Sequence, residues 1–133
     1  MAVGRWPLAA KSQSLKNMRD FRKYEIWQKA VDLADKVYTI CDGLPKYELY
    51  ALGDQLRRAA VSIASNIAEG ASRKSSAEFA HYLEIAIGSA FEVETQLQIA
   101  LRRKYISDEV FNEILSELQS EERQINTFIS KLR

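Results

Sequence analysis

The chain of 133 residues contains only one cysteine and one histidine. A single cysteine excludes an internal disulfide framework and any zinc site with several cysteines, and a single histidine excludes a two-histidine metal motif. Only 5 glycines and 2 prolines occur in a sequence that is 47% hydrophobic, which excludes a low-complexity or disordered chain. No apolar run approaches the roughly 18 residues of a membrane-spanning helix. We expect one soluble domain in a reducing, cytoplasmic compartment.

Signals of catalysis are also lacking. The sequence contains no phosphate-binding loop, no nucleophile elbow and no dinucleotide-binding glycine motif. Glu78 and His81 form a single E-x-x-H pair, whereas a di-metal helical bundle needs two. Cys41 falls on an apolar stripe, where a small buried residue is expected. We therefore expect a protein that is not an enzyme and that binds neither a metal nor a cofactor.

Positive charge is concentrated near the start of the chain. The net charge is +1, but residues 1–24 hold six bases and one acid, whereas residues 106–133 hold six acids and three bases. Residues 1–17 show no helical period and are expected to form a flexible basic arm. Met18 opens a more regular sequence. The alternative is that Met18 is the original start and that residues 1–17 are an upstream extension. Residues 18–133 are expected to form the folded domain.

Apolar residues recur at steps of three and four through this domain, which is typical of amphipathic helices. Gly43 and Pro45 supply a helix stop, and Ser75 with Glu78 forms a capping box. Short links make consecutive helices antiparallel neighbours. The sequence thus predicts an all-α, antiparallel up-down-up-down four-helix bundle, with helices at about residues 24–42, 47–69, 75–104 and 107–132.

The aromatic residues of the bundle divide into two groups. One group falls on the predicted core stripes and is expected to pack inside the bundle: Trp27, Tyr38 and Phe79. The other group lies near one bundle end and is better placed for exposure: Tyr47, Tyr50 and Tyr105. In the last helix, Glu121 and Glu122 interrupt the apolar stripe.

A polar face accompanies the apolar stripe on the second and third helices. Its members share a face because they recur at steps of three and four: Gln55, Arg58, Ser62, Asn66 and Glu69 on one helix, and Ser89, Glu92 and Gln96 on the other. Such a face is either exposed to solvent or satisfied in a polar network, inside the bundle or between subunits. We expect Arg58 to face residues 85–89 and to pair with a buried Glu92. The small residues 88–90 would let another helix approach, which favours a homo-oligomer.

An up-down topology collects basic residues at the two ends of the bundle. One end gathers the arm with Arg73, Lys74, Lys131 and Arg133, and the other gathers Lys46, Arg102, Arg103 and Lys104. In a ring of protomers these residues would repeat as basic rims that follow a phosphate backbone. We expect an oligomer that binds RNA or DNA through such rims. The alternative is an oligomeric scaffold for a protein partner, with no nucleic-acid role.

Three segments of the sequence resemble the bacterial four-helix-bundle family of the 23S rRNA intervening-sequence proteins: FRKYEIWQKAV (21–31), QLRRAAVSIASNIAEG (55–70) and GSAFEVETQL (88–97). The resemblance covers residues 18–133 and implies ring-shaped homo-oligomers such as pentamers. The residues that match the family motif are Gln55, Arg57, Arg58, Ser62, Asn66, Glu69, Gly70, Ser89 and Glu92. Ala64 stands where many relatives have proline, which removes a helix kink. The matching residues are expected to serve the bundle or an interface first, and ligand contact second.

Overall fold

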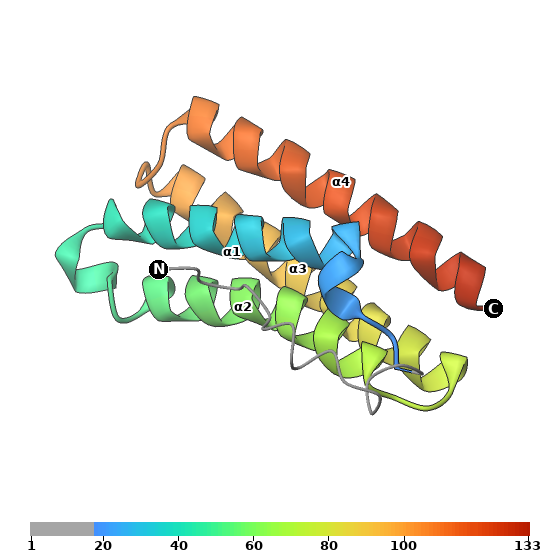
Figure 1. Ribbon diagram of the computed structural model, residues 1–133. Coiled ribbons are helices and arrows are strands. Elements are labelled where there is room, and N and C mark those ends of the chain that lie inside the picture. Colours follow the sequence, from blue (N-terminus) through green and yellow to red (C-terminus); the bar gives the residue numbers. More distant parts are fainter. Residues whose placement is uncertain (1–17) are drawn as a thin grey trace.

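A computed structural model describes residues 18–133 of the chain (Figure 1). The predicted arm at residues 1–17 lies outside the described residues. The elements, in order, are the 3₁₀ helix η3 (Phe21–Lys23), α1 (Glu25–Asp42), the 3₁₀ helix η4 (Lys46–Glu48), α2 (Leu52–Ala71), α3 (Ser76–Arg102) and α4 (Asp108–Leu132). The predicted all-α, four-helix fold is confirmed.

Consecutive α-helices run in opposite directions along the bundle (Figure 1). α2 packs against both α1 and α3, and α4 packs against α3 and α1. Tyr47 follows α1 and Tyr105 follows α3, and their hydroxyl groups lie 3.4 Å apart. The α1–α2 and α3–α4 connections therefore lie at one end of the bundle, and the α2–α3 connection lies at the other.

Two helices begin at serine caps that the sequence predicts. The Ser75 hydroxyl accepts a hydrogen bond of 3.1 Å from the backbone N–H of Glu78, and the Ser107 hydroxyl accepts one of 3.1 Å from the N–H of Val110. Each bond satisfies an amide that has no partner within the first helical turn.

Two helix limits differ from those predicted. α2 begins at Leu52 rather than near residue 47, because residues 46–48 form the separate 3₁₀ turn η4. α3 ends at Arg102, and Lys104 adopts a left-handed backbone conformation with φ of 63°. A left-handed residue just beyond the last turn is a common way to end a helix.

The buried face of α1 is offset from the predicted stripe. Its buried residues are Ile26, Ala30, Leu33, Val37 and Cys41. Tyr38 is 46% exposed, so the prediction that it packs in the core is wrong, and Val31 beside it on the same strip is 41% exposed. Two adjacent apolar strips run along α1, and burial of the strip that contains the larger aliphatic side chains turns the other toward solvent. Phe79 is fully buried, as predicted, and Trp27 is half-buried against the core.

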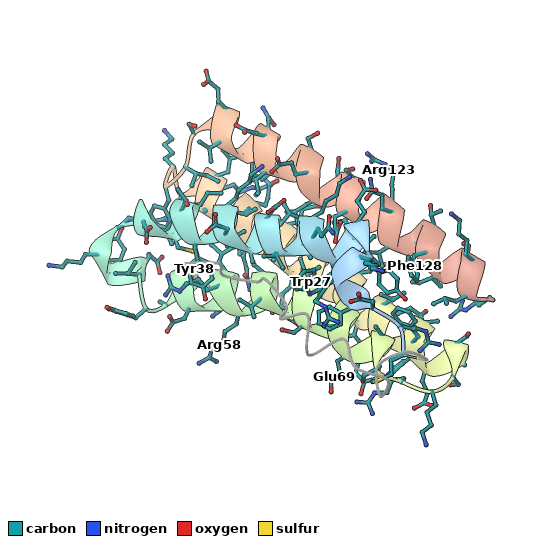
Figure 2. All side chains as sticks on the ribbon, in the orientation of Figure 1. Trp27, Tyr38, Arg58, Glu69, Arg123 and Phe128 are labelled. Atoms are coloured by element: carbon teal, nitrogen blue, oxygen red, sulfur yellow. The ribbon has the colours of Figure 1, made fainter. Side chains whose placement is uncertain are left out.

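Aromatic rings close the bundle where α1 begins and α4 ends (Figure 2). The Tyr24 ring centroid lies 5.0 Å from that of Phe128, and the Phe79 and Phe128 centroids are 5.4 Å apart. The Arg19 guanidinium lies 4.9 Å from the centre of the Phe79 ring and donates a hydrogen bond of 3.3 Å to the Ala71 carbonyl. The residues before α1 are thereby attached to the C-terminal end of α2.

Candidate functional site

Basic and tyrosine side chains gather where the α1–α2 and α3–α4 connections meet. We call this region the tyrosine end, and its members are Lys46, Tyr47, Tyr50, Arg102, Arg103, Lys104 and Tyr105. The Tyr47 and Tyr105 ring centroids lie 6.4 Å apart in an edge-on arrangement, and the Tyr105 hydroxyl donates a hydrogen bond of 3.0 Å to Glu48. These contacts bring the two halves of the tyrosine end together, although they are more than fifty residues apart in the sequence.

The tyrosine end exposes both charge and aromatic surface. Tyr47 is 74% exposed and Tyr50 is 80% exposed, which confirms their predicted exposure, whereas Tyr105, for which exposure was also expected, is half-buried against the core. Within residues 18–133, no carboxylate lies within ion-pair distance of Lys46, Arg102 or Lys104. Exposed cations bind phosphate, and exposed tyrosine rings offer faces on which bases stack.

Arg103, the remaining cation of the tyrosine end, contacts the neighbouring side chain of Tyr105. A hydrogen bond between the side chains of Arg103 and Tyr105 raises the pKa of Arg103. The pKa of Tyr105 is itself raised, first by its hydrogen bond with Tyr47. Both groups therefore keep their protons at neutral pH, and Arg103 remains a cation next to the tyrosine pair.

Several basic residues at the opposite end are engaged within the chain. Arg73 forms an ion pair of 3.1 Å with Glu69 and lies 4.7 Å from the centre of the Tyr82 ring. Arg133 forms an ion pair of 3.2 Å with Glu84. Among the described cations at this end, Lys23, Lys74 and Lys131 are exposed and have no ion pair. Both predicted basic rims therefore keep unpaired cations among the described residues, and the tyrosine end differs in its exposed rings of Tyr47 and Tyr50.

Part of the predicted polar face forms a network between α2 and α3. The Ser62 and Ser89 hydroxyl oxygens lie 2.8 Å apart. The Asn66 amide donates hydrogen bonds of 2.9 Å to the Ser62 hydroxyl and 2.8 Å to the Ser62 carbonyl. Farther along, the Gln96 amide lies 3.5 Å from the Gln55 side-chain oxygen, with Gln96 buried and Gln55 exposed. These small polar groups bridge the two helices inside one protomer.

The charged members of the predicted face do not join this network. Arg57 pairs with Asp54 at 2.6 Å and donates to the Leu49 carbonyl at 2.7 Å, so it fixes the start of α2. Arg58 and Glu92 are both exposed, and no ion pair joins them. The prediction of a buried Glu92 paired with Arg58 inside the chain is therefore wrong. Figure 2 shows Arg58 projecting away from the bundle.

The predicted alignment of α2 with α3 is also wrong, by about one and a half helical turns. Ser62 lies opposite Ser89 rather than Leu83, and Gly70 near the end of α2 lies against Phe79 and Tyr82. A Cβ atom on Gly70 would lie 2.7 Å from the Tyr82 Cβ and 3.0 Å from the Phe79 ring. Loop length alone does not reveal which glycine makes this contact.

Glu121 is a buried residue whose position the sequence only hinted at. It is 0% exposed, and neither carboxylate oxygen has a hydrogen-bond partner within the described chain. Burial raises its pKa to about 8, and the smaller effects are a lowering by Lys29 and a raising by Glu25. The pKa of the adjacent Glu122 is raised to about 7, first by burial and then by Glu94. The sequence feature that indicated its burial was the spacing of residues 114, 118, 121 and 125, which puts Glu121 on the apolar stripe of α4.

The described residues offer little for metal or thiol chemistry. No group of three or more histidine, cysteine, aspartate or glutamate side chains in residues 18–133 could hold a metal ion. Cys41 is buried, and burial raises the pKa of its thiol, which disfavours the reactive thiolate. Across the same range, none of the helices combines the length and hydropathy needed to cross a bilayer.

The fold and its surfaces define a four-helix-bundle protein with a basic, tyrosine-bearing end. The sequence model for the family described as 23S rRNA-intervening sequence protein matches residues 22–127, and the chain belongs to this family. The chain is similar to a crystal structure of a protein with unknown function from the S23 ribosomal protein family of Bacteroides thetaiotaomicron. The two are 25% identical, with a TM-score of 0.73, over 78% of this chain and 97% of that one. No curated protein matches this chain.

Proposed function

We propose that this protein is a non-enzymatic homo-oligomer, a closed ring such as a pentamer, that binds single-stranded RNA or DNA through its tyrosine end. The observation that carries the proposal is the combination of Lys46, Arg102 and Lys104, which have no ion pairs among the described residues, with the exposed rings of Tyr47 and Tyr50. Cations supply a salt-dependent attraction to phosphate. Base stacking on an aromatic ring contributes about 1–3 kcal/mol per base and needs unpaired bases.

The distribution of charge supports one binding end rather than a uniformly attractive surface. The net charge is only +1, and residues 106–133 hold six acids and three bases. The acids along α4 repel phosphate, and at the tyrosine end, where Asp108 and Glu109 begin α4, the attraction depends on Lys46, Arg102 and Lys104, which no carboxylate pairs with among the described residues. In a closed ring, each protomer would add one such end to a common rim, and several weak contacts would act together.

A binding assay on the full-length protein tests this proposal. The probes are a fluorescent single-stranded RNA, the matching DNA, a duplex and a 23S rRNA fragment, the last because the family description mentions 23S rRNA. The variant replaces Lys46, Arg102 and Lys104 with alanine. The matched control removes the same charge elsewhere by replacing Lys74, Arg123 and Lys131, which are exposed and have no ion pairs in the described chain.

We expect wild-type affinity for single strands to fall steeply between about 50 and 200 mM salt. The tyrosine-end variant should bind at least tenfold more weakly and with a shallower salt dependence, whereas the control should stay within about threefold of wild type. Equal losses in both variants would contradict a localised site. A protein that assembles but binds none of the four probes would instead favour the scaffold for a protein partner.

A further inference from the structure

The outer face of α3 carries apolar side chains that the protomer does not bury. Ile85 is 40% exposed, Phe91 is 55% exposed and Ile99 is 47% exposed. Ile85, Glu92 and Ile99 are seven residues apart, and Gly88 and Thr95 fall between them at steps of three and four. This is the spacing of a helix–helix seam. We call residues 85, 88, 92, 95 and 99 the α3 seam.

Gly88 lies at the centre of the α3 seam, and nothing inside the described protomer requires a glycine there. A Cβ atom at Gly88 would meet no atom within 4 Å, whereas one at Gly70 would collide with Tyr82. Glycine inside a helix costs about 1 kcal/mol of stability relative to alanine. A glycine on an exposed helix face allows another backbone to come close. A close neighbour of Gly88 would then come from outside the described residues.

Two opposite charges flank the same surface. Arg58 on α2 and Glu92 on α3 are exposed and have no ion pair in residues 18–133. The Ser62–Ser89 contact puts them at nearly the same level of the bundle, since Arg58 is one turn before Ser62 and Glu92 is almost one turn after Ser89. Covering Glu92 with apolar surface would be unfavourable unless a cation paired with it.

We propose that the α3 seam packs against a second copy of this chain, and that Arg58 of one copy pairs with Glu92 of its neighbour. The occupant is a second copy because each chain carries both members of the pair on adjacent helices, so it can offer Arg58 to one neighbour and Glu92 to another, as a closed ring requires. A carboxylate inside an otherwise apolar seam fixes the register of association at some expense in stability. This inference rests on the assembly in the proposed function and identifies the interface that makes it.

Charge reversal distinguishes contacts between chains from contacts within one chain. The full-length variants Arg58→Glu and Glu92→Arg are each measured by light scattering, alone and as an equimolar mixture. We expect each variant alone to lose the assembled mass and to fall toward the mass of a single chain. In the mixture, every contact between unlike chains again joins a carboxylate to a guanidinium, so we expect assembled mass to return, although a ring of five keeps at least one contact between like chains. A pair formed within one chain cannot be restored by mixing.

Folding and the role of the seam are tested separately. Both variants should keep the helical circular dichroism of wild type, because both side chains are exposed. Gly88→Gln should likewise fold, since the space around residue 88 is open, but it should lose assembled mass because a long side chain blocks close approach. If all three variants keep the full assembled mass, or if mixing restores none of it, the proposal that the α3 seam is the interface is overturned. The proposal of nucleic-acid binding would still stand in either case. A wild-type protein with the mass of one chain would overturn both.

Discussion

The hydroxyl oxygens of Ser62 and Ser89 lie 2.8 Å apart at the contact between α2 and α3. Asn66 completes the group by donating to Ser62, so the polar atoms at this crossing are satisfied locally. Small hydroxyl side chains allow the helices to approach and supply a directional contact that fixes their alignment. An apolar contact of the same size would leave that alignment less well specified.

The first prediction concerns this hydrogen-bonded group. Ser62→Ala removes the partner of both Ser89, which is buried, and Asn66. We expect the free energy of unfolding to fall by about 1–2 kcal/mol in urea denaturation, because a hydrogen bond lost near the interior contributes about that much. Ser65→Ala on the same helix is exposed and serves as the control, with an expected change under about 0.5 kcal/mol. Equal effects of the two substitutions would show that the network is not stabilising.

A second prediction compares two glycines. Gly70→Ala would push a Cβ atom to within 2.7 Å of the Tyr82 Cβ, and we expect a loss of about 1–3 kcal/mol of stability. Gly88→Ala meets open space, so in a dissociated protomer it should add up to about 1 kcal/mol through helix propensity. Thermal melts at low protein concentration would compare the two. A destabilising Gly88→Ala in single chains would contradict the open surface.

The third prediction follows from the buried carboxyl group of Glu121. Its pKa is about 8 in the folded chain and near 4.5 when unfolded, so the folded state holds the proton more tightly. Stability from this group is therefore full below about pH 4.5 and is lost as the pH rises through about 8. Within that window the limiting slope is about 1.4 kcal/mol per pH unit. Denaturation midpoints from pH 5 to 9 would reveal it.

Glu121→Leu should remove this part of the pH dependence. It should also raise the free energy of unfolding at pH 8 by about 1–3 kcal/mol, because an unpartnered polar group is replaced by an apolar one in the core. Glu113→Gln, on the exposed side of α4, is the control and should leave the slope unchanged. A residual slope near pH 7 is expected from Glu122. A decrease in stability for Glu121→Leu at pH 8 would contradict the buried, unpaired carboxylate.

A fourth prediction concerns the start of the domain. Arg19 donates to the Ala71 carbonyl and lies over Phe79, so Arg19→Ala should lower stability by about 1–3 kcal/mol. Removal of residues 1–17 retains Arg19 and should leave a cooperative thermal melt close to that of the full chain. Loss of that melt would mean that the arm is part of the fold.

The fifth prediction separates stacking from charge at the tyrosine end. Replacing Tyr47 and Tyr50 with alanine should weaken single-stranded RNA binding by about tenfold or more, since each stacked base contributes about 1–3 kcal/mol. The salt dependence should stay the same, because no phosphate contact is lost. The exposed Tyr38 is the control, and Tyr38→Ala should leave binding unchanged. A matching loss in that variant would mean that the binding surface lies elsewhere.

The sequence predicted the fold well because its periodic pattern, caps and short links all agree. Ser75 and Ser107 cap helices where expected, and the four-helix arrangement follows from the link lengths. The buried face of α1 was missed because two apolar strips run side by side, and only tertiary packing selects one. The alignment of α2 with α3 was missed because the contacts that accompany it, Ser62 with Ser89 and Gly70 with Tyr82, cannot be deduced from loop length.

The candidate site was predictable in composition but not in pairing. The sequence indicated which bases gather at each end, since topology fixes that. It could not show that Arg73 is engaged by Glu69 or that Lys46 and Lys104 lack carboxylate partners within residues 18–133, because rotamers and neighbours decide both. The exposure of Arg58 and Glu92 could not be predicted from the sequence either, because a polar face has the same residue spacing whether it is buried in the protomer or exposed on its surface.

The most direct test of a nucleic-acid-binding assembly is light scattering of the full-length protein, with and without a single-stranded RNA, at low and moderate salt. We predict a mass several times that of one chain, an increase when RNA is added at low salt, and loss of that increase at moderate salt. A single-chain mass, or an assembly whose mass ignores RNA at low salt, would contradict the proposed function.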